Sequence, residues 1–204
     1  SQINPHFLYN TLNSIKWMAT IQNATGIAEM TTSLSRLMKS VSKDTNQIIS
    51  IQQELDLLNN YFIIQKYRYG GTIRLDINVI DEDLYQCQIP KFTLQPMVEN
   101  AIFHGIEPKG SVGKIIITIE SLDDQTIQIT IEDNGIGLSE EQISSILATN
   151  DNSSSGLFKK IGINNVNQRI RYAFGDNYGL QFHSKEGECT IITILLPKLI
   201  TPPA

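Results

Sequence analysis

Residues 96–105 read PMVENAIFHG, a helical segment near the middle of the chain in which polar side chains stand among apolar ones. Asn100 lies between apolar neighbours, and a polar side chain in such surroundings needs a partner. An asparagine carbonyl is a suitable hard ligand for Mg²⁺, which keeps several waters and takes the rest of its shell from nucleotide phosphates. We therefore predict that Asn100 can hold Mg²⁺. Glu99 and His104 have a simpler explanation as ordinary residues of the polar face of the helix, with His104 one turn beyond Asn100.

On both sides of this helix the sequence changes to the β-branched alternation that is typical of half-buried strands. A mixed sheet covered on one face by helices is the arrangement that this order of elements favours, so the predicted fold class is α+β. We expect strands at 74–80, 114–121, 126–132, 180–184 and 189–196, and helices at 92–104, 140–148 and 163–174.

The segment EDNGIGL, at 132–138, follows one of these strands directly. A carboxylate at Asp133 can accept a hydrogen bond from the exocyclic amine of adenine. Gly135 and Gly137 let the backbone approach a ring closely. Asp, Asn and Gly are also the usual turn formers, so a plain turn explains this string equally well.

Gly162 precedes a predicted helix that begins with Ile163, Asn164 and Asn165, after a pair of lysines. Helix N-termini attract phosphate through their free amide groups and the helix dipole. A helix that starts after a loop is common, so this signal is weak alone. Three further cations are interpreted as solvated surface charges: Arg68, Lys109 and Arg169.

Apolar residues in the first third of the chain have helical spacing. Two helices joined by the polar connection 22–26 predict a helical hairpin, and one hairpin covers only one side of each apolar seam. Two chains that associate as a four-helix bundle would cover the rest, so we predict a homodimer. A third helix, 50–69, ends at Gly70 and Gly71. The predicted domains are therefore residues 1–70 and 71–204.

The hairpin begins with NPHFLYN, at 4–10, in which His6 lies almost opposite the apolar stripe and should face solvent. Trp17 lies on the same side, which suggests a docking surface. A neutral imidazole has a lone pair that can attack phosphorus. A surface histidine near a helix start is, taken alone, simply a polar residue.

Composition limits the classes of function. The 204 residues are 41% apolar and 18% charged, which is globular, and a formal charge of −5 argues against a general nucleic-acid binder. Cys87 and Cys189 lack metal-ligand spacing and suit a reducing compartment. No apolar run reaches the roughly 18 residues that span a bilayer, so we expect no membrane contact by this segment. Because the chain opens on Ser1, we expect it to be the C-terminal part of a longer protein.

Four segments, QINPHFLYNTLNSI, LQPMVENAIFHG, EDNGIGL and GINNVNQRI, closely resemble the phosphoacceptor, N, G1 and G2 boxes of LytS/YesM-type sensor histidine kinases. The resemblance covers nearly the whole chain. It implies a Bergerat-type (GHKL) ATP-binding α/β sandwich joined to a dimeric hairpin that carries the histidine. It also implies roles for particular residues: phosphorylation of His6, a Mg²⁺ ligand at Asn100, adenine binding at Asp133, a nucleotide site shaped by Gly135, Gly137 and Gly162 together with His104 and Asn165, and an ATP lid at 139–161.

The chain departs from the family's pattern at several positions. Phe7 follows His6 where many histidine kinases have an acid, so no general base is assigned. Pro96 stands four residues before Asn100, where related ATPases that use water carry a glutamate, which favours transfer to His6 over hydrolysis. In the G2 region, Phe158 and Lys160 stand where glycines are usual, and Cys189 occupies a place that is often glycine.

The resemblance therefore implies a kinase that moves the ATP γ-phosphoryl group to His6 and then to an aspartate of a response regulator. It places this region on the cytoplasmic side of a bacterial membrane, below an upstream membrane sensor. Two alternatives stay open. A regulatory ATP-binding module would need Asp133 and Asn100 but not His6, and a structural dimerisation domain would need none of them.

Overall fold

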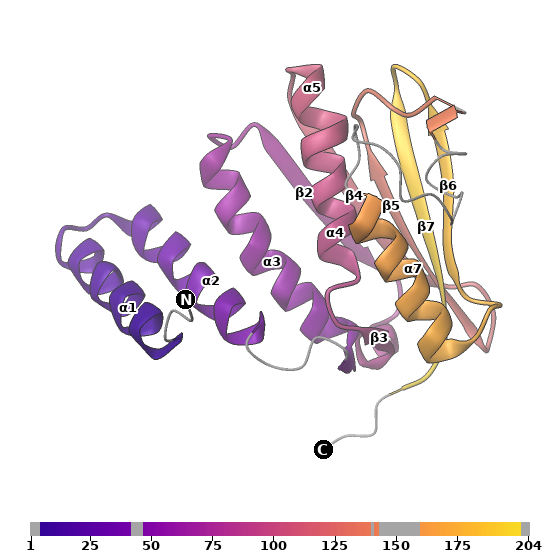
Figure 1. The fold of residues 1–204 in the computed structure, drawn as a ribbon, viewed down its shortest axis with the longest axis horizontal. Coiled ribbons are helices and arrows are strands. Elements are labelled where there is room, and N and C mark those ends of the chain that lie inside the picture. Colours follow the sequence, from indigo (N-terminus) through magenta and orange to yellow (C-terminus); the bar gives the residue numbers. More distant parts are fainter. Residues whose placement is uncertain (1–4, 42–46, 140, 143–159, 201–204) are drawn as a thin grey trace.

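The computed structural model describes residues 5–41, 47–139, 141–142 and 160–200. A helical hairpin lies at one end of the molecule, and a sheet with helices on one of its faces lies at the other (Figure 1). The predicted α+β class is confirmed.

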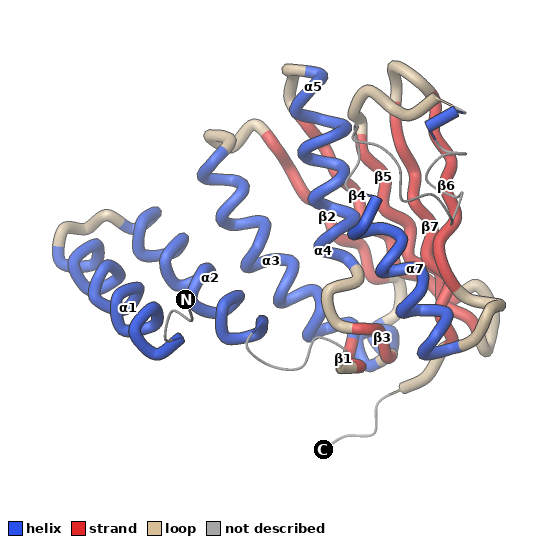
Figure 2. Tube along the Cα trace, in the orientation of Figure 1, coloured by secondary structure: helices blue, strands red, loops and turns tan. Residues whose placement is uncertain are grey.

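The N-terminal hairpin consists of two antiparallel helices, α1 (Pro5–Ile21) and α2 (Thr25–Val41). A tight turn joins them, in which Asn23 has a positive φ of 55°, a conformation that asparagine tolerates better than most residues. The helix α1 packs against α2, and α2 packs in turn against the next helix. Figure 2 shows α1 on the side of α2 that faces away from the sheet. The predicted hairpin is therefore confirmed, and α2 connects it to the rest of the molecule.

The third helix, α3 (Ile51–Arg68), starts at a capping box. Ser50 Oγ accepts from the Gln53 backbone N–H at 3.2 Å, and Gln53 Oε1 accepts from the Ser50 N–H at 3.1 Å, which satisfies two amides at the helix start. The helix ends before Gly70 and Gly71, both with positive φ, as predicted. Its apolar face lies in the same hydrophobic core as the sheet. The division of domains at residue 70 stays a prediction.

The sheet has five strands, of which only the first pair is parallel. Helices α3, α4 (Leu94–Asn100) and α7 (Lys160–Phe174) lie on one of its faces (Figure 1). The strand order is β2 (Ile73–Val79), β4 (Gly113–Ser121), β5 (Thr126–Asp133), β7 (Cys189–Pro197) and β6 (Gly179–Lys185).

Alternation along the strands builds the core, because successive side chains of a strand point to opposite faces. In the middle of the neighbouring strands β4 and β5, every second residue is an isoleucine with almost no exposed surface: Ile115, Ile117, Ile119, Ile127, Ile129 and Ile131. The predicted mixed sheet with helices on one face is therefore confirmed.

Short elements close the end of the sandwich that lies at the bottom of Figure 1, and the sequence pattern did not predict them. The strand β1 (Ile48–Ser50) pairs antiparallel with β3 (Gln88–Pro90), and a 3₁₀ turn, η1 (Glu82–Gln86), precedes β3. Three residues are too few to display a period of two, so the sequence pattern carries no signal for such strands.

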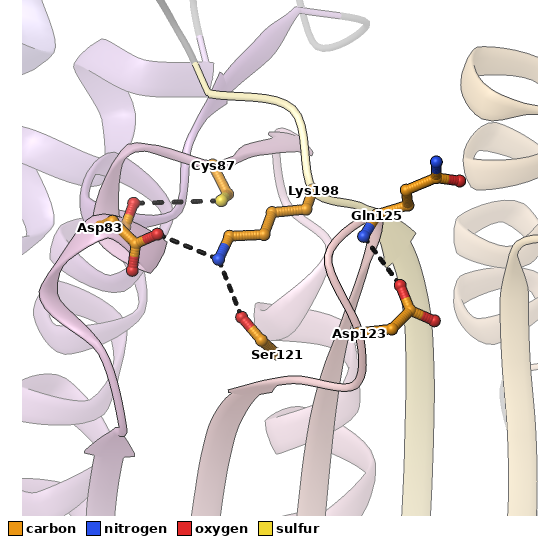
Figure 3. A network of polar contacts seen from close by, with 6 residues as sticks. All are labelled: Asp83, Cys87, Ser121, Asp123, Gln125 and Lys198. Carbon is orange, nitrogen blue, oxygen red and sulfur yellow. Dashed lines mark hydrogen bonds and ion pairs between the residues drawn. The ribbon is translucent and has the colours of Figure 1, made fainter.

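The end of β7 is anchored by a polar network (Figure 3). Lys198 Nζ lies 3.0 Å from Asp83 Oδ2 and donates to Ser121 Oγ at 3.0 Å. Cys87, which is fully buried, lies close by, with Sγ 4.0 Å from the Asp83 carbonyl. The network ties the C-terminal strand to η1 and to the end of β4.

The helix that carries PMVENAIFHG changes its winding partway. After α4 it continues as a π-helix, η2 (Ala101–Ile106), and then as α5 (Glu107–Lys109), ending at Gly110 with a φ of 66°. The predicted helix at 92–104 thus exists, begins two residues later and runs further. A π segment inside a helix frequently marks a functional site, because the wider turn redirects side chains. Among the described helices, none is both long and apolar enough to cross a bilayer.

Candidate nucleotide-binding site

A hollow lies between the π-helix, the end of β5, the loop after β5 and the helix α7. It encloses about 340 Å³, including its mouth, which is open to solvent. It is lined by Asn100, Ala101, His104, Gly105, Asp133, Gly137, Leu138, Ile163, Phe182, Thr190 and Ile192. Four of the residues singled out from the sequence, Asn100, His104, Asp133 and Gly137, therefore meet in one place although they lie on three segments.

Asp133 is the buried acid of this hollow, with 4% of its surface exposed. Its Oδ1 accepts from the Gly135 N–H at 2.8 Å, and Thr190 is its partner in the β5–β7 register. Burial raises the pKa of Asp133 to about 6, while the Gly135 amide and the nearby Lys109 charge act in the opposite direction. At pH 7 the carboxyl is therefore mainly ionised and is a hydrogen-bond acceptor suited to an exocyclic amine.

Two glycines let the π-helix and the loop after β5 meet backbone to backbone. A Cβ on Gly135 would collide with the Gly105 backbone, and a Cβ on Gly105 would lie 2.8 Å from Asp133 Oδ1. The Ile136 N–H donates to the Gly105 carbonyl at 3.0 Å. Gly105 was not singled out from the sequence. The signal was present, because a glycine inside a helix costs about 1 kcal/mol relative to alanine and needs a reason.

Gly137 holds the same loop against the turn between β6 and β7. Its φ is 67°, and a Cβ there would collide with the Lys185 carbonyl. The Gly187 N–H donates to the Ile136 carbonyl at 2.6 Å, and the Leu138 N–H donates to Ser184 Oγ at 2.7 Å. The loop is thus held on both sides, which fixes the position of Asp133.

Asn100 is the last residue of α4 and lines the hollow. Its Nδ2 donates to the Pro96 carbonyl at 2.7 Å, so Oδ1 is the atom of this amide that can bind a ligand. In the described part of the chain, no three His, Cys, Asp or Glu side chains gather as a metal site. A single hard oxygen fits Mg²⁺ that takes most of its shell from water and phosphates.

His104 and Gly162 flank this part of the site. Burial lowers the pKa of His104, with Glu107 acting in the opposite direction, so the imidazole in the wall of the hollow is neutral at pH 7. Gly162 faces the Pro96 side chain, which would lie 3.8 Å from an added Cβ. The helix α7 begins at Lys160, three residues earlier than predicted, so Gly162 lies within its first turn.

Other predicted residues lie outside the hollow. Asn165 is exposed on α7 and does not line it. His6 is exposed on α1, with Nδ1 3.3 Å from Asn10 Nδ2, and α1 lies beyond α2 from the sheet (Figure 1). If Asn10 instead presents its amide oxygen to a protonated Nδ1, the lone pair is on Nε2. Most of the predicted lid, and the predicted helix at 140–148 with it, falls outside the described residues.

The three cations interpreted as surface charges differ in their surroundings. Lys109 is exposed, yet its Nζ donates to the Asn134 carbonyl at 2.5 Å and so holds the loop after β5. Arg68 is exposed and lies over the rings of Tyr69 and Phe103. For Arg169 the interpretation is wrong, because it is half-buried and donates to the Lys91 carbonyl. The helix period alone did not reveal that contact, since it depends on a loop 78 residues away.

Comparison with known proteins agrees with this geometry. Residues 90–200 match the family model described as histidine kinase-, DNA gyrase B- and HSP90-like ATPase, and residues 1–73 match the histidine kinase model. The sheet, the glycine contacts and the buried carboxylate thus define an ATP-binding domain of the class shared by these proteins. The predicted Bergerat-type (GHKL) fold is confirmed.

The chain belongs to the histidine kinase family, and its resemblance to the LytS/YesM type is confirmed. It is 36% identical to the sensor histidine kinase YesM of Bacillus subtilis strain 168 and 35% identical to BtsS of Escherichia coli K12. Each alignment covers 97% of this chain but only 32% of the relative. A solved structure of the histidine kinase ThkA in complex with the response regulator TrrA has a TM-score of 0.53 at 17% identity, over 90% of this chain and 51% of that one.

Proposed function

We propose that this chain binds ATP in the hollow at Asp133 and passes the γ-phosphoryl group to His6. The observation that carries the proposal is the buried Asp133 carboxylate, held by the Gly135 amide beneath the Gly105–Gly135 contact, in a chain that also presents an exposed histidine on a helical hairpin. The first feature supports adenine recognition, and the second supplies an acceptor. Membership of the histidine kinase family supports their combination.

Each residue has a proposed role. Asp133 accepts from the adenine amine, Gly135 and Gly137 let the loop approach the base, and His104 forms part of the wall. Gly162 lies in the first turn of α7, where free amides favour phosphate, and Asn165, one turn further along, offers a side-chain amide on the exposed face of that helix. Asn100 Oδ1 would hold Mg²⁺, which would supply positive charge to offset the charge of the phosphates.

The proposed reaction is an in-line phosphoryl transfer. A ring nitrogen of His6 forms a bond to the γ-phosphorus as the bond from that phosphorus to the oxygen bridging to the β-phosphate breaks. ADP leaves with the electron pair of the broken bond, and the imidazole releases its N–H proton. Positioning and charge stabilisation supply most of the rate in such reactions. Pro96, which has no carboxylate with which to activate water, supports transfer to a side chain over hydrolysis.

His6 and the hollow lie on different parts of the chain, and the helix against which α1 packs is α2. Transfer therefore requires either a rearrangement of the hairpin or an approach from a second chain. A homodimer is compatible with both routes. Its formation is supported by apolar residues that are exposed along α2 at every seventh position, at Ile27, Leu34 and Val41. This spacing is that of a bundle seam, and we propose that a second copy covers it.

The next acceptor is proposed to be an aspartate of a response regulator, supported by the complex between ThkA and its regulator TrrA. Since the chain spans about a third of YesM and BtsS, a sensor upstream of it is part of the same proposal. In that longer protein this region would lie on the cytoplasmic side of the membrane.

The experiment is incubation of the chain with γ-labelled ATP and Mg²⁺, followed by mapping of the label by mass spectrometry at alkaline pH. We expect an acid-labile, base-stable label that disappears in His6→Gln. The matched control is His183→Gln, the same change at another exposed histidine, which should keep the label. Label that survives His6→Gln would overturn the proposal, and nucleotide binding without any label would favour a regulatory ATP-binding module.

A further inference from the structure

A buried carboxylate outside the nucleotide site connects the hairpin side of the molecule to it. Glu54, in the first turn of α3, has 1% of its surface exposed. Its Oε2 accepts from the Phe92 N–H and its Oε1 from the Leu94 N–H, both at 2.8 Å. The carboxylate thus reaches across 40 residues of sequence to the start of α4. A buried carboxyl group needs such partners.

The start of α4 has no local cap of its own. Thr93, the residue before the helix, makes no side-chain cap bond, and its hydroxyl donates to the Pro90 carbonyl instead. Phe92 has a φ of 57°, a left-handed conformation that costs about 1 kcal/mol or more outside glycine. The Phe92 amide is one of the two that Glu54 holds. The carboxylate therefore replaces the missing cap and stabilises the strained turn.

Neighbouring elements meet at the same turn. Arg169, on α7, donates to the Lys91 carbonyl, and its charge lies near Glu54. Lys91 is itself buried, and its Nζ donates to the Ser40 carbonyl at the end of α2 at 2.7 Å. The segment 91–94 is therefore in contact with α2, α3 and α7 at once. Of these helices, α2 carries the exposed apolar seam, α3 packs on the sandwich, and α7 begins at the proposed phosphate side of the site.

The geometry points to Glu54 as a positioning residue that fixes the start of α4 and thereby sets Asn100 for its metal and nucleotide. The capped amide of Leu94 and the proposed Mg²⁺ ligand Asn100 are the first and last residues of the seven-residue helix α4, a rise of about 9 Å along one rigid helix. Asp133 belongs to a different element and is positioned by Gly135 and Thr190. Glu54 thus acts on the metal side of the site more than on the adenine side. This inference rests on the proposed function.

The test compares ADP binding with and without Mg²⁺ by titration calorimetry in the 204-residue chain. Glu54→Gln replaces one of the two carboxylate oxygens by an NH₂ group, which faces a backbone N–H and cannot accept a hydrogen bond from it. We therefore expect Mg²⁺-dependent ADP binding to weaken about fivefold. Binding without Mg²⁺ should change less than about twofold. The matched control is Asp56→Asn, which removes a charge from an exposed position of the same helix and should leave both affinities unchanged.

A second variant covers the case in which Glu54→Gln does not fold. Arg169→Gln removes the other anchor of the same turn and should weaken Mg²⁺-dependent binding in the same direction, by about twofold. Equal affinities in Glu54→Gln and Asp56→Asn would overturn the inference while leaving the proposed function intact. A parallel loss with and without Mg²⁺ would also overturn it, because Glu54 would then only hold the fold. If the unaltered chain binds no ADP, the proposed function itself fails.

Discussion

The hairpin α1–α2 and the sandwich formed by the described residues from 47 to 200 place their apolar side chains in opposite environments. In the sandwich Ile117 and its neighbours are fully buried between sheet and helices, whereas in the hairpin Trp17 is 67% exposed and Ile21 is 78% exposed. The sandwich therefore covers its own core, and the hairpin does not. The difference indicates that the hairpin leaves apolar surface available to a further partner, whereas the sandwich buries its own apolar side chains.

The largest expected effect comes from making the same substitution in both regions. Ile117→Ala removes a fully buried side chain and should lower the free energy of unfolding by about 3 kcal/mol. Ile15→Ala, at a position that is 42% exposed, should lower it by less than about 1 kcal/mol. Urea denaturation followed by circular dichroism at low protein concentration measures both. Equal losses would contradict the comparison.

The second prediction concerns pH. Burial raises the pKa of Asp133 to about 6 and that of Glu54 to about 7. Between about pH 4 and pH 7 the folded chain therefore holds protons that the unfolded chain has released, so these two groups make stability fall as pH rises. Relative to the double variant Asp133→Asn, Glu54→Gln, the unaltered chain should lose about 2 kcal/mol for each of the two groups across this window.

Chemical denaturation at several pH values measures that difference. The loss of stability with rising pH should arise in the sandwich alone, since Asp133 and Glu54 both lie there. Parallel pH profiles for the two proteins would show that neither carboxyl contributes.

The third prediction separates nucleotide binding from association. Asp133→Asn keeps the shape of the side chain but presents an amide where an acceptor is needed, so ADP should bind about 30-fold more weakly. Its self-association, measured by sedimentation, should not change, because the hairpin is untouched. Asp176→Asn, at an exposed position after α7, is the control and should keep full affinity.

The smallest effect is expected at the seam of the hairpin. Leu34→Ala removes part of the apolar stripe on α2 and should raise the dimer dissociation constant about fivefold, because little area is lost. Sedimentation equilibrium measures this constant, and Lys39→Ala on the same helix should leave it unchanged. A seam insensitive to Leu34→Ala would mean that another face of the hairpin associates.

The sequence predicted the fold and singled out some of the residues that line the hollow, and the reasons differ between residues. Asp133 and Asn100 were found because each lies in a short motif whose residue types suit one chemistry, and the strands were found because isoleucines alternate over many residues. Gly105 was overlooked, although its cost within a helix marks it. Thr190 enters the hollow only through the pairing of β7 with β5, which strand periodicity does not specify.

By itself the sequence determined which residues can bind, react or pack, because side-chain chemistry and periodicity are local properties. Tertiary structure alone decided that Asn100, His104, Asp133 and Gly137 line one hollow while Asn165 does not. It also decided that Glu54 caps a helix 40 residues away and that Arg169 is no surface charge. Those contacts depend on how strands pair and helices cross, and such long-range geometry leaves no regular spacing in the chain.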